Sequence, residues 1–277
     1  MAESEGPTVF VGWLHPLDVK ARFAESLLGL LAYDAIVRTS EGKPRQIAAM
    51  NGFEAGVNIA TPRNDLVRRF LDHPEWGEWC LMVDVDMQFD PDAVERLLAV
   101  ADPVKAPIVG GLCFGATDND LWPTVYELAE EPGQGPCFMR AGEIPAEGLM
   151  RCAGTGAAFL LVHRSVFEAV AARRWPEDPH GHFPWFQETQ FPIGPVGEDL
   201  TFCLRAGICG FPVHVLTSLH IGHIKPTVLN AYRYFKQQGR VVDGPPEDDP
   251  GVAAVAPYWP LPPDLTGAAE LPSEVSA

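Results

Sequence analysis

The stretch WCLMVDVDMQFDPDAVERLL, residues 79–98, combines an apolar run, two closely spaced aspartates and the start of a helical pattern. Residues Cys80 to Val83 form a continuous apolar run, which is typical of a strand buried on both faces of a sheet. Asp84 and Asp86 come where this strand should end, and residues two apart in a strand point to the same side. We therefore expect both carboxylates at the carboxyl end of a strand, where open α/β sheets bind ligands.

Two aspartates in this position have a structural and a functional explanation. The structural one is a turn that precedes a helix, and Asp90, followed by Pro91, is predicted to cap that helix. The functional one is a divalent-metal site, because Mg²⁺ and Mn²⁺ bind carboxylate oxygens and usually share them with substrate phosphates. An EF-hand calcium loop is a poor fit, because the glycine and the glutamate that it needs are absent.

Strand and helix patterns alternate along most of the chain. This alternation predicts an α/β fold with a mostly parallel central sheet flanked by helices. Two long excursions, residues 113–150 and 173–197, are predicted to be irregular apart from a short edge strand at residues 123–128, and the second is dense in aromatic side chains. Besides the run just quoted, strands are expected at residues 8–13, 47–50, 57–60, 105–112, 157–163 and 211–216.

Composition limits the class of protein. The chain has 277 residues, is 47% hydrophobic and carries a formal net charge of −17, so we expect a soluble globular protein that does not bind nucleic-acid backbones nonspecifically. Six cysteines without a CxxC pair indicate reduced thiols and a cytoplasmic location. Neither a signal sequence nor a membrane span is apparent. Residues 1–240 are predicted to form one domain, and residues 241–277 an acidic, Pro/Ala-rich, flexible tail.

Two motifs in the first two thirds of the chain place polar or small residues beside predicted elements. Arg63 and Asn64 lie in the first turn of a helix predicted from Thr61, either as surface residues or facing a nucleotide diphosphate. Gly154 belongs to the Gly-rich turn of GTGAAFLLVHR, just before a predicted strand. Gly110 and Gly111 end the strand predicted at residues 105–112, and paired glycines after a strand suggest a close approach of backbone or ligand.

Two further motifs lie toward the end of the chain. Glu198 and Asp199 begin the helix of GEDLTFCLR, where the helix dipole favours carboxylates in any case. His220 and His223 follow the last predicted strand, and either of them is a possible metal ligand.

Taken in order, these motifs resemble those of GT-A fold glycosyltransferases of family 2, and most of all their short actinobacterial and actinobacteriophage members. The resemblance covers residues 8–235. VDVD matches the family's Asp-x-Asp motif, and GEDLTFCLR matches its Glu-Asp motif with the trailing Arg205. The resemblance implies a single Rossmann-like GT-A domain, a nucleotide-sugar donor such as a UDP-sugar, and a bound Mn²⁺ or Mg²⁺.

The resemblance also implies a role for each motif residue. Asp199 would be the catalytic base of an inverting hexosyl transfer, with Glu198 orienting the acceptor. His223 matches the position of a metal-binding histidine better than His220 does. Nucleotide contacts are implied for Arg63, Asn64, Asp84 and Gly154, and metal ligation for Asp84, Asp86 and His223.

The chain departs from the family pattern at Thr217, where relatives often have an acid. The acceptor is not implied by the motifs, and a hydroxyl of a protein, such as a virion protein, and a modified DNA base both remain open. A retaining transfer remains open as well. So do two other classes, a nucleotidyltransferase, although VGWLHPLDVK lacks a basic Gly-rich phosphate loop, and a non-catalytic metal-binding structural protein.

Overall fold

The computed structural model describes residues 8–56, 58–117, 120–131 and 135–225. Residues up to Ile224 belong to one compact unit. The predicted domain boundary at residue 240 and the predicted tail lie outside the described residues.

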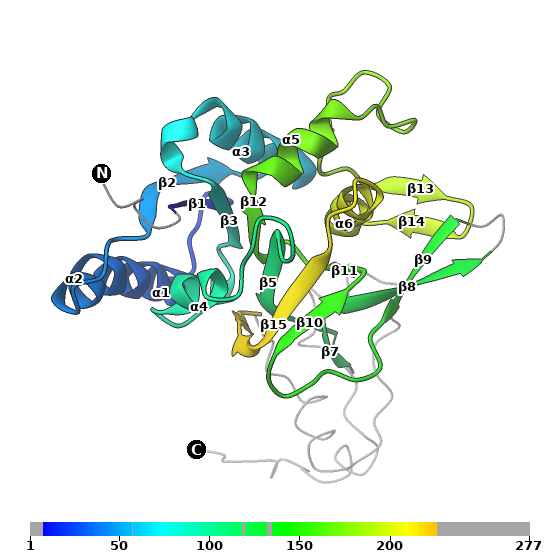
Figure 1. Ribbon diagram of the computed structural model, residues 1–277. Helices are drawn as coiled ribbons and strands as arrows, with labels where there is room; N and C mark the ends of the chain where they lie inside the picture. Colours follow the sequence, from blue (N-terminus) through cyan, green and yellow to red (C-terminus); the bar gives the residue numbers. More distant parts are fainter. Residues whose placement is uncertain (1–7, 57, 118–119, 132–134, 226–277) are drawn as a thin grey trace, which may run out of the picture. The chain divides into compact units, whose positions relative to one another are not determined.

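A seven-stranded sheet in the order β10–β15–β5–β12–β3–β1–β2 forms the centre of this unit (Figure 1). β12 runs antiparallel to both of its neighbours and β10 antiparallel to β15, whereas the remaining neighbouring pairs are parallel. The predicted α/β fold with a mostly parallel sheet is therefore confirmed. The strands are β1 (Val9–His15), β2 (Ile47–Glu54), β3 (Trp79–Asp84), β5 (Ile108–Leu112), β10 (Leu149–Cys152), β12 (Phe159–His163) and β15 (Val213–His220).

Helices cover both faces of the sheet, and the strands alternate between them. Leu81 and Val83 of β3 pack in the core on one face, whereas Cys80 and Met82 pack in the core on the other. Such alternation is why a strand between two helical layers is apolar throughout. The first face is covered by α1 (Ala21–Ala32) and α4 (Ala93–Leu98), and the second by α3 (Ala60–Asp72), α5 (Arg164–Ala172) and α6 (Glu198–Ile208).

Short helical segments follow a helix on each face of the sheet. A π-helical turn, η1 (Tyr33–Val37), leads from α1 into α2 (Arg38–Ser40), and a 3-10 turn, η2 (Pro74–Trp76), follows α3. No helix in the described part of the chain has the length and hydropathy required to cross a membrane.

The short edge strand predicted at residues 123–128 corresponds to β8 (Val125–Glu131). The rest of the two excursions contains further short strands, so the prediction that it is irregular is wrong in its detail. Their hydrogen-bonding partners are hairpin neighbours and residues distant in sequence, which a local apolar pattern does not indicate. The additional strands are β4 (Met87–Gln88), β6 (Phe114–Ala116), β7 (Leu121–Pro123), β8 (Val125–Glu131), β9 (Gly135–Arg140), β11 (Gly154–Thr155), β13 (Thr189–Phe191), β14 (Gly194–Val196) and β16 (Gly222–His223).

Two predicted local features differ from the structure. Residues 58–60 are not a strand, because α3 already begins at Ala60 and the Asn58 side chain accepts a hydrogen bond from the Ala60 amide at 2.9 Å. Asp90 does not cap α4, which begins only at Ala93, after a turn in which the Ala93 amide donates to the Asp90 carbonyl.

Candidate active site

The candidate site lies at the carboxyl end of β3. Asp84 is the last residue of that strand, and the backbone then turns, so that Asp86 lies in the turn before β4. Both aspartates were expected to point to the same side, Asp84 toward the nucleotide and the metal and Asp86 toward the metal. In the structure they have separate partners, Arg63 for Asp84 and His223 for Asp86.

Arg63 connects the end of β3 with the start of α6. Its Nη2 donates to the two carboxylate oxygens of Asp84 at 3.2 and 3.0 Å, and its Nη1 donates to Oε1 of Glu198. The Arg63 side chain is 4% exposed, while those of Asp84 and Glu198 are each 21% exposed. Burial opposes its charge, but Asp84, Glu198 and Asp199 outweigh this effect, so the pKa of Arg63 is raised. Arg63, in the first turn of α3, is thus a buried cation that lies between the end of β3 and the start of α6.

Two carboxyls around Arg63, those of Asp84 and Asp199, have raised pKa values. Burial raises the pKa of Asp84, and nearby Asp86 adds to this while Arg63 opposes it. Burial also raises the pKa of Asp199, with Glu198 adding to the effect and Arg63 again opposing it. Perturbed carboxyls of this kind gather at functional sites.

A short antiparallel ladder between β4 and β16 brings Asp86 and His223 together. His223 pairs with Met87, and the Ile224 amide donates to the Asp86 carbonyl at 2.7 Å. Because β3 and β15 both run antiparallel, directly or through β5, to β12, their carboxyl ends lie at one edge of the sheet. Residues 86 and 223 therefore meet although 137 positions separate them.

The two ring nitrogens of His223 have different partners. Its Nδ1 is 2.7 Å from the Phe114 carbonyl oxygen, which can only accept, so Nδ1 donates. Its Nε2 is 3.0 Å from Oδ2 of Asp86. A carboxylate oxygen and an imidazole nitrogen without a proton both offer lone pairs, which is what a bound cation requires.

This arrangement fits a divalent cation. A metal-binding histidine usually donates its other ring N–H to a carbonyl or carboxylate, as His223 does to Phe114. Imidazole and carboxylate together suit Mn²⁺, whose remaining positions are filled by substrate phosphates or water. Among the described residues there is no group of three or more His, Cys, Asp or Glu side chains that could hold a metal ion. A cation here would accordingly take two protein ligands, Asp86 and His223.

His220, the alternative ligand, lies at the exposed end of β15. The ladder register places His223, and not His220, beside Asp86.

Asn64 and Gly154 lie away from any open surface. Asn64 is completely buried, its Nδ2 donates to the carbonyls of Ala60 and Phe186, and its Oδ1 accepts from the amides of Trp185 and Phe186. All four hydrogen-bonding positions of this amide are used within the chain. A Cβ on Gly154 would lie 2.8 Å from the Leu200 side chain. Their placement does not match the expectation of direct nucleotide contact, and both instead pack the elements that surround the site.

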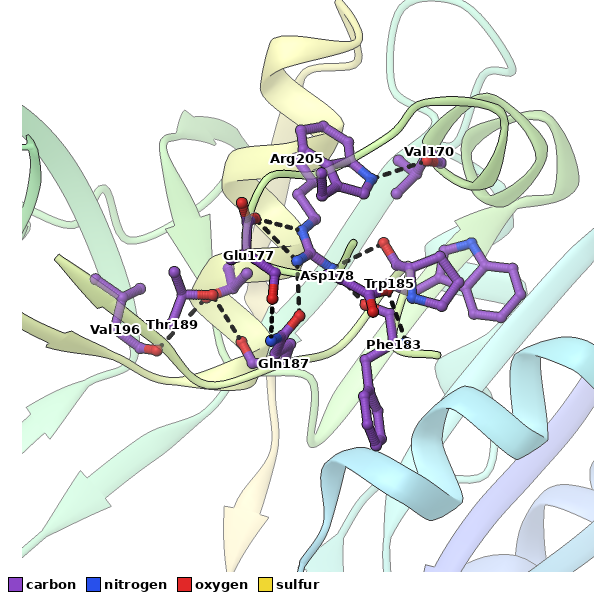
Figure 2. Close-up of polar contacts among 12 residues, drawn as sticks. Val170, Glu177, Asp178, Phe183, Trp185, Gln187, Thr189, Val196 and Arg205 are labelled. Atoms are coloured by element: carbon purple, nitrogen blue, oxygen red, sulfur yellow. Dashed lines mark hydrogen bonds and ion pairs between the residues drawn. The ribbon is translucent and has the colours of Figure 1, made fainter. Parts of the chain in front are cut away.

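Arg205 is a residue whose role the sequence did not show. It is 1% exposed on α6, and its guanidinium donates to the carbonyls of Phe183 and Pro184, to Oε1 of Glu177 and to Oε1 of Gln187 (Figure 2). It thereby ties the segment after α5 to α6. Only its place after the Glu-Asp motif signalled it in the sequence.

A cavity of about 420 Å³ adjoins this anchored segment. Neither Asn58 nor Glu188, two of its lining residues, was singled out by any sequence pattern. The lining consists of Asn58, Ile59, Ala60, Phe183, Gln187, Glu188 and Glu198.

Comparison with known proteins finds similarity in structure but not in sequence. No family model matches the chain, and no curated protein matches it. Among solved structures, A197 from STIV is 14% identical over 79% of this chain and 86% of that one, with a TM-score of 0.45. GalNAc-T7, solved with UDP, GalNAc and Mn²⁺, is 10% identical over 80% of this chain and 45% of that one, with a TM-score of 0.49.

A glycosyltransferase involved in the glycosylation of the major capsid of PBCV-1 is also similar. It is 10% identical over 58% of this chain and 63% of that one, with a TM-score of 0.31. The chain spans less than two thirds of the length of two of these three neighbours. At such identities and TM-scores the likeness is distant and assigns no activity.

Proposed function

We propose that the protein is a metal-dependent, inverting glycosyltransferase that moves a hexose from a nucleotide-sugar, most simply a UDP-sugar, to an acceptor hydroxyl. The observation that carries the proposal is the His223 contact, in which one ring nitrogen is bound to a carbonyl and the other faces Asp86. This pair lies at the same sheet edge as the Arg63–Asp84–Glu198 cluster. A site for a diphosphate-bound cation and a separate carboxylate for proton transfer are what such a reaction requires.

The donor half of the site consists of Asp86, His223 and Asp84. Asp86 and His223 would hold the cation, which neutralises the charge that develops on the nucleoside diphosphate as it leaves. Arg63 holds both oxygens of Asp84 and so fixes the orientation of that carboxylate. The remaining lone pairs of the Asp84 carboxylate can accept hydrogen bonds from the donor's ribose hydroxyls.

The acceptor half consists of Asp199 and Glu198. In an inverting transfer the bond from the anomeric carbon to the diphosphate oxygen breaks, and its electron pair leaves with the nucleoside diphosphate. The acceptor oxygen bonds to the same carbon and gives its proton to Asp199. The raised pKa of Asp199 suits this task, because a general base works best when its pKa lies nearer the operating pH. Glu198 accepts a hydrogen bond that orients the acceptor hydroxyl.

The first test is a thermal-shift screen of UDP-, GDP- and dTDP-sugars with and without Mn²⁺, followed by an assay for hydrolysis of any donor that binds. We expect stabilisation by one nucleotide-sugar that depends on Mn²⁺, and slow release of free sugar. His223→Gln should remove the Mn²⁺ dependence, whereas His220→Gln serves as the matched control. No donor-dependent shift and no hydrolysis across the panel would favour a non-catalytic metal-binding protein instead.

Two further outcomes separate the remaining reactions. A nucleotidyltransferase would release pyrophosphate from a nucleoside triphosphate and sugar phosphate, which an inorganic-pyrophosphate assay detects. A retaining transferase would give a product with the anomeric configuration of the donor, which proton NMR of the new glycosidic bond shows. In that case Asp199 would not be the base.

A further inference from the structure

The cavity beside Glu198 has the properties of a small-molecule site. Its volume of about 420 Å³ falls within the range of pockets that hold small ligands, about 300–1,000 Å³. One wall comes from residues 58–60 at the start of α3, and another from the segment 183–188, which contributes Phe183, Gln187 and Glu188. Glu198, which also lines it, accepts a hydrogen bond from Arg63 and immediately precedes Asp199. The cavity therefore adjoins the start of α6, the helix that carries Asp199, the proposed base.

The wall formed by residues 183–188 is held from two sides. Asn64 on α3 bonds the backbone of Trp185 and Phe186, while Arg205 on α6 bonds the Phe183 and Pro184 carbonyls (Figure 2). Both anchoring side chains are almost completely buried. A wall fixed in this way loses little conformational entropy when a ligand binds, so it favours recognition of a defined shape.

The polar groups of the cavity call for a ligand that donates hydrogen bonds. The Gln187 amide is already used, since its Nε2 donates to the Glu177 carbonyl and its Oε1 accepts from Arg205. Glu188 is exposed and Glu198 gives one oxygen to Arg63, so both carboxylates keep capacity to accept. Phe183 adds an aromatic, apolar surface. A compact, partly apolar ring that carries hydroxyl groups suits these residues, because its hydroxyls can donate hydrogen bonds to Glu188 and Glu198 and its apolar face can pack against Phe183.

We propose that this cavity is the acceptor subsite and that the acceptor is an uncharged carbohydrate. Its hydroxyls donate to Glu188 and Glu198, and its ring lies against Phe183. This proposal rests on the proposed function, because it places the acceptor beside the start of α6, which carries the proposed base Asp199. It disfavours a modified DNA base, since two carboxylates repel the phosphates that flank such a base. It also disfavours the surface of a folded protein, which would require a contact area of about 800 Å² on each partner instead of a small cavity.

The first experiment measures binding without any donor. Saturation-transfer NMR is recorded with the methyl glycosides of glucose, galactose, mannose and rhamnose, using the wild-type chain and the variants Phe183→Ala and Glu188→Gln. Glu147→Gln, which removes an exposed carboxylate that does not line the cavity, is the matched control. We expect at least one glycoside to bind the wild type and the control, and its signal to fall in both cavity variants. Binding of glucosamine but of no methyl glycoside would overturn the uncharged ligand.

The second experiment measures transfer, with the donor identified by the hydrolysis assay. The expected result is transfer to the glycoside that binds, with an acceptor KM about tenfold higher in Glu188→Gln, which corresponds to one hydrogen bond to a charged group. Transfer to a hydroxyl-bearing peptide or to hydroxymethylated DNA, but to no saccharide, would overturn the inference while leaving the proposed function intact. Glycoside binding without donor hydrolysis would instead overturn the proposed function and leave the binding site.

Discussion

Arg63→Met should destabilise the protein strongly, and more so at neutral than at acidic pH. The substitution keeps most of the side chain's apolar stem but removes the cation from Asp84 and Glu198, which are each only 21% exposed. Removing one partner of a buried ion pair costs about 3–5 kcal/mol. For a domain of this size, each kcal/mol lowers the Tm by about 2–4 °C, so we expect a decrease of about 6–20 °C at pH 7.5.

The pH dependence distinguishes electrostatics from lost packing. The pKa values of Asp84 and Asp199 are already raised with Arg63 present, and losing Arg63 raises them further. At pH 5 these carboxyls can therefore take up protons, which relieves part of the destabilisation. Tm is measured by differential scanning calorimetry at both pH values, with the exposed Arg69→Met on the same helix as the control. A decrease for Arg63→Met that matches the control, or that is equal at both pH values, would refute the assigned role.

The other predictions concern single groups of the site. Asp86→Ala and His223→Gln should each abolish Mn²⁺-dependent donor binding in titration calorimetry, because each removes one of two protein ligands, whereas His220→Gln should leave it unchanged. Asp199→Asn should slow transfer by a factor of about 100 to 10,000 while donor binding persists. Because the folded-state pKa of Asp199 is raised, its charge destabilises the fold above that pKa, so Asp199→Asn should raise the Tm at pH 7 and lose this effect below the ordinary aspartate pKa. Asn64→Ala leaves buried backbone groups of the 183–188 wall without partners, and should lower stability by about 3 kcal/mol and raise the acceptor KM.

The elements that the sequence predicted well are those with an extended apolar run. β3 and β12 are buried on both faces, so their identity is set by composition alone, and their positions could be predicted to within a few residues. The short strands β4 and β16 have two residues each and are defined only by pairing with one another across the chain. A local pattern carries no signal for such a pair, and most of the short strands in the two excursions were not predicted for the same reason.

The site shows the same division. The motifs indicated Arg63, Asp84 and Asp86, but the spacing of the two aspartates suggested that their side chains point to the same side. The turn after β3 separates the two side chains, and this turn is stabilised by the β4–β16 ladder, which is a long-range contact. The choice between His220 and His223 likewise depends on the ladder register and not on the sequence around either residue.

The charges around Arg63 lead to an expected order of binding. Among the described residues, the surroundings of Arg63 contain one guanidinium and four carboxylates, those of Asp84, Asp86, Glu198 and Asp199. The chain as a whole has a net charge of −17. A nucleoside diphosphate is itself an anion, so it meets repulsion at this edge unless positive charge enters with it or before it. Asp86 and His223 supply the place where that charge binds, and Arg63, already engaged by Asp84 and Glu198, is not free to take over this role. We therefore expect the cation to bind before the donor or together with it, so that donor affinity measured by calorimetry rises with Mn²⁺ concentration until the Asp86–His223 site is saturated.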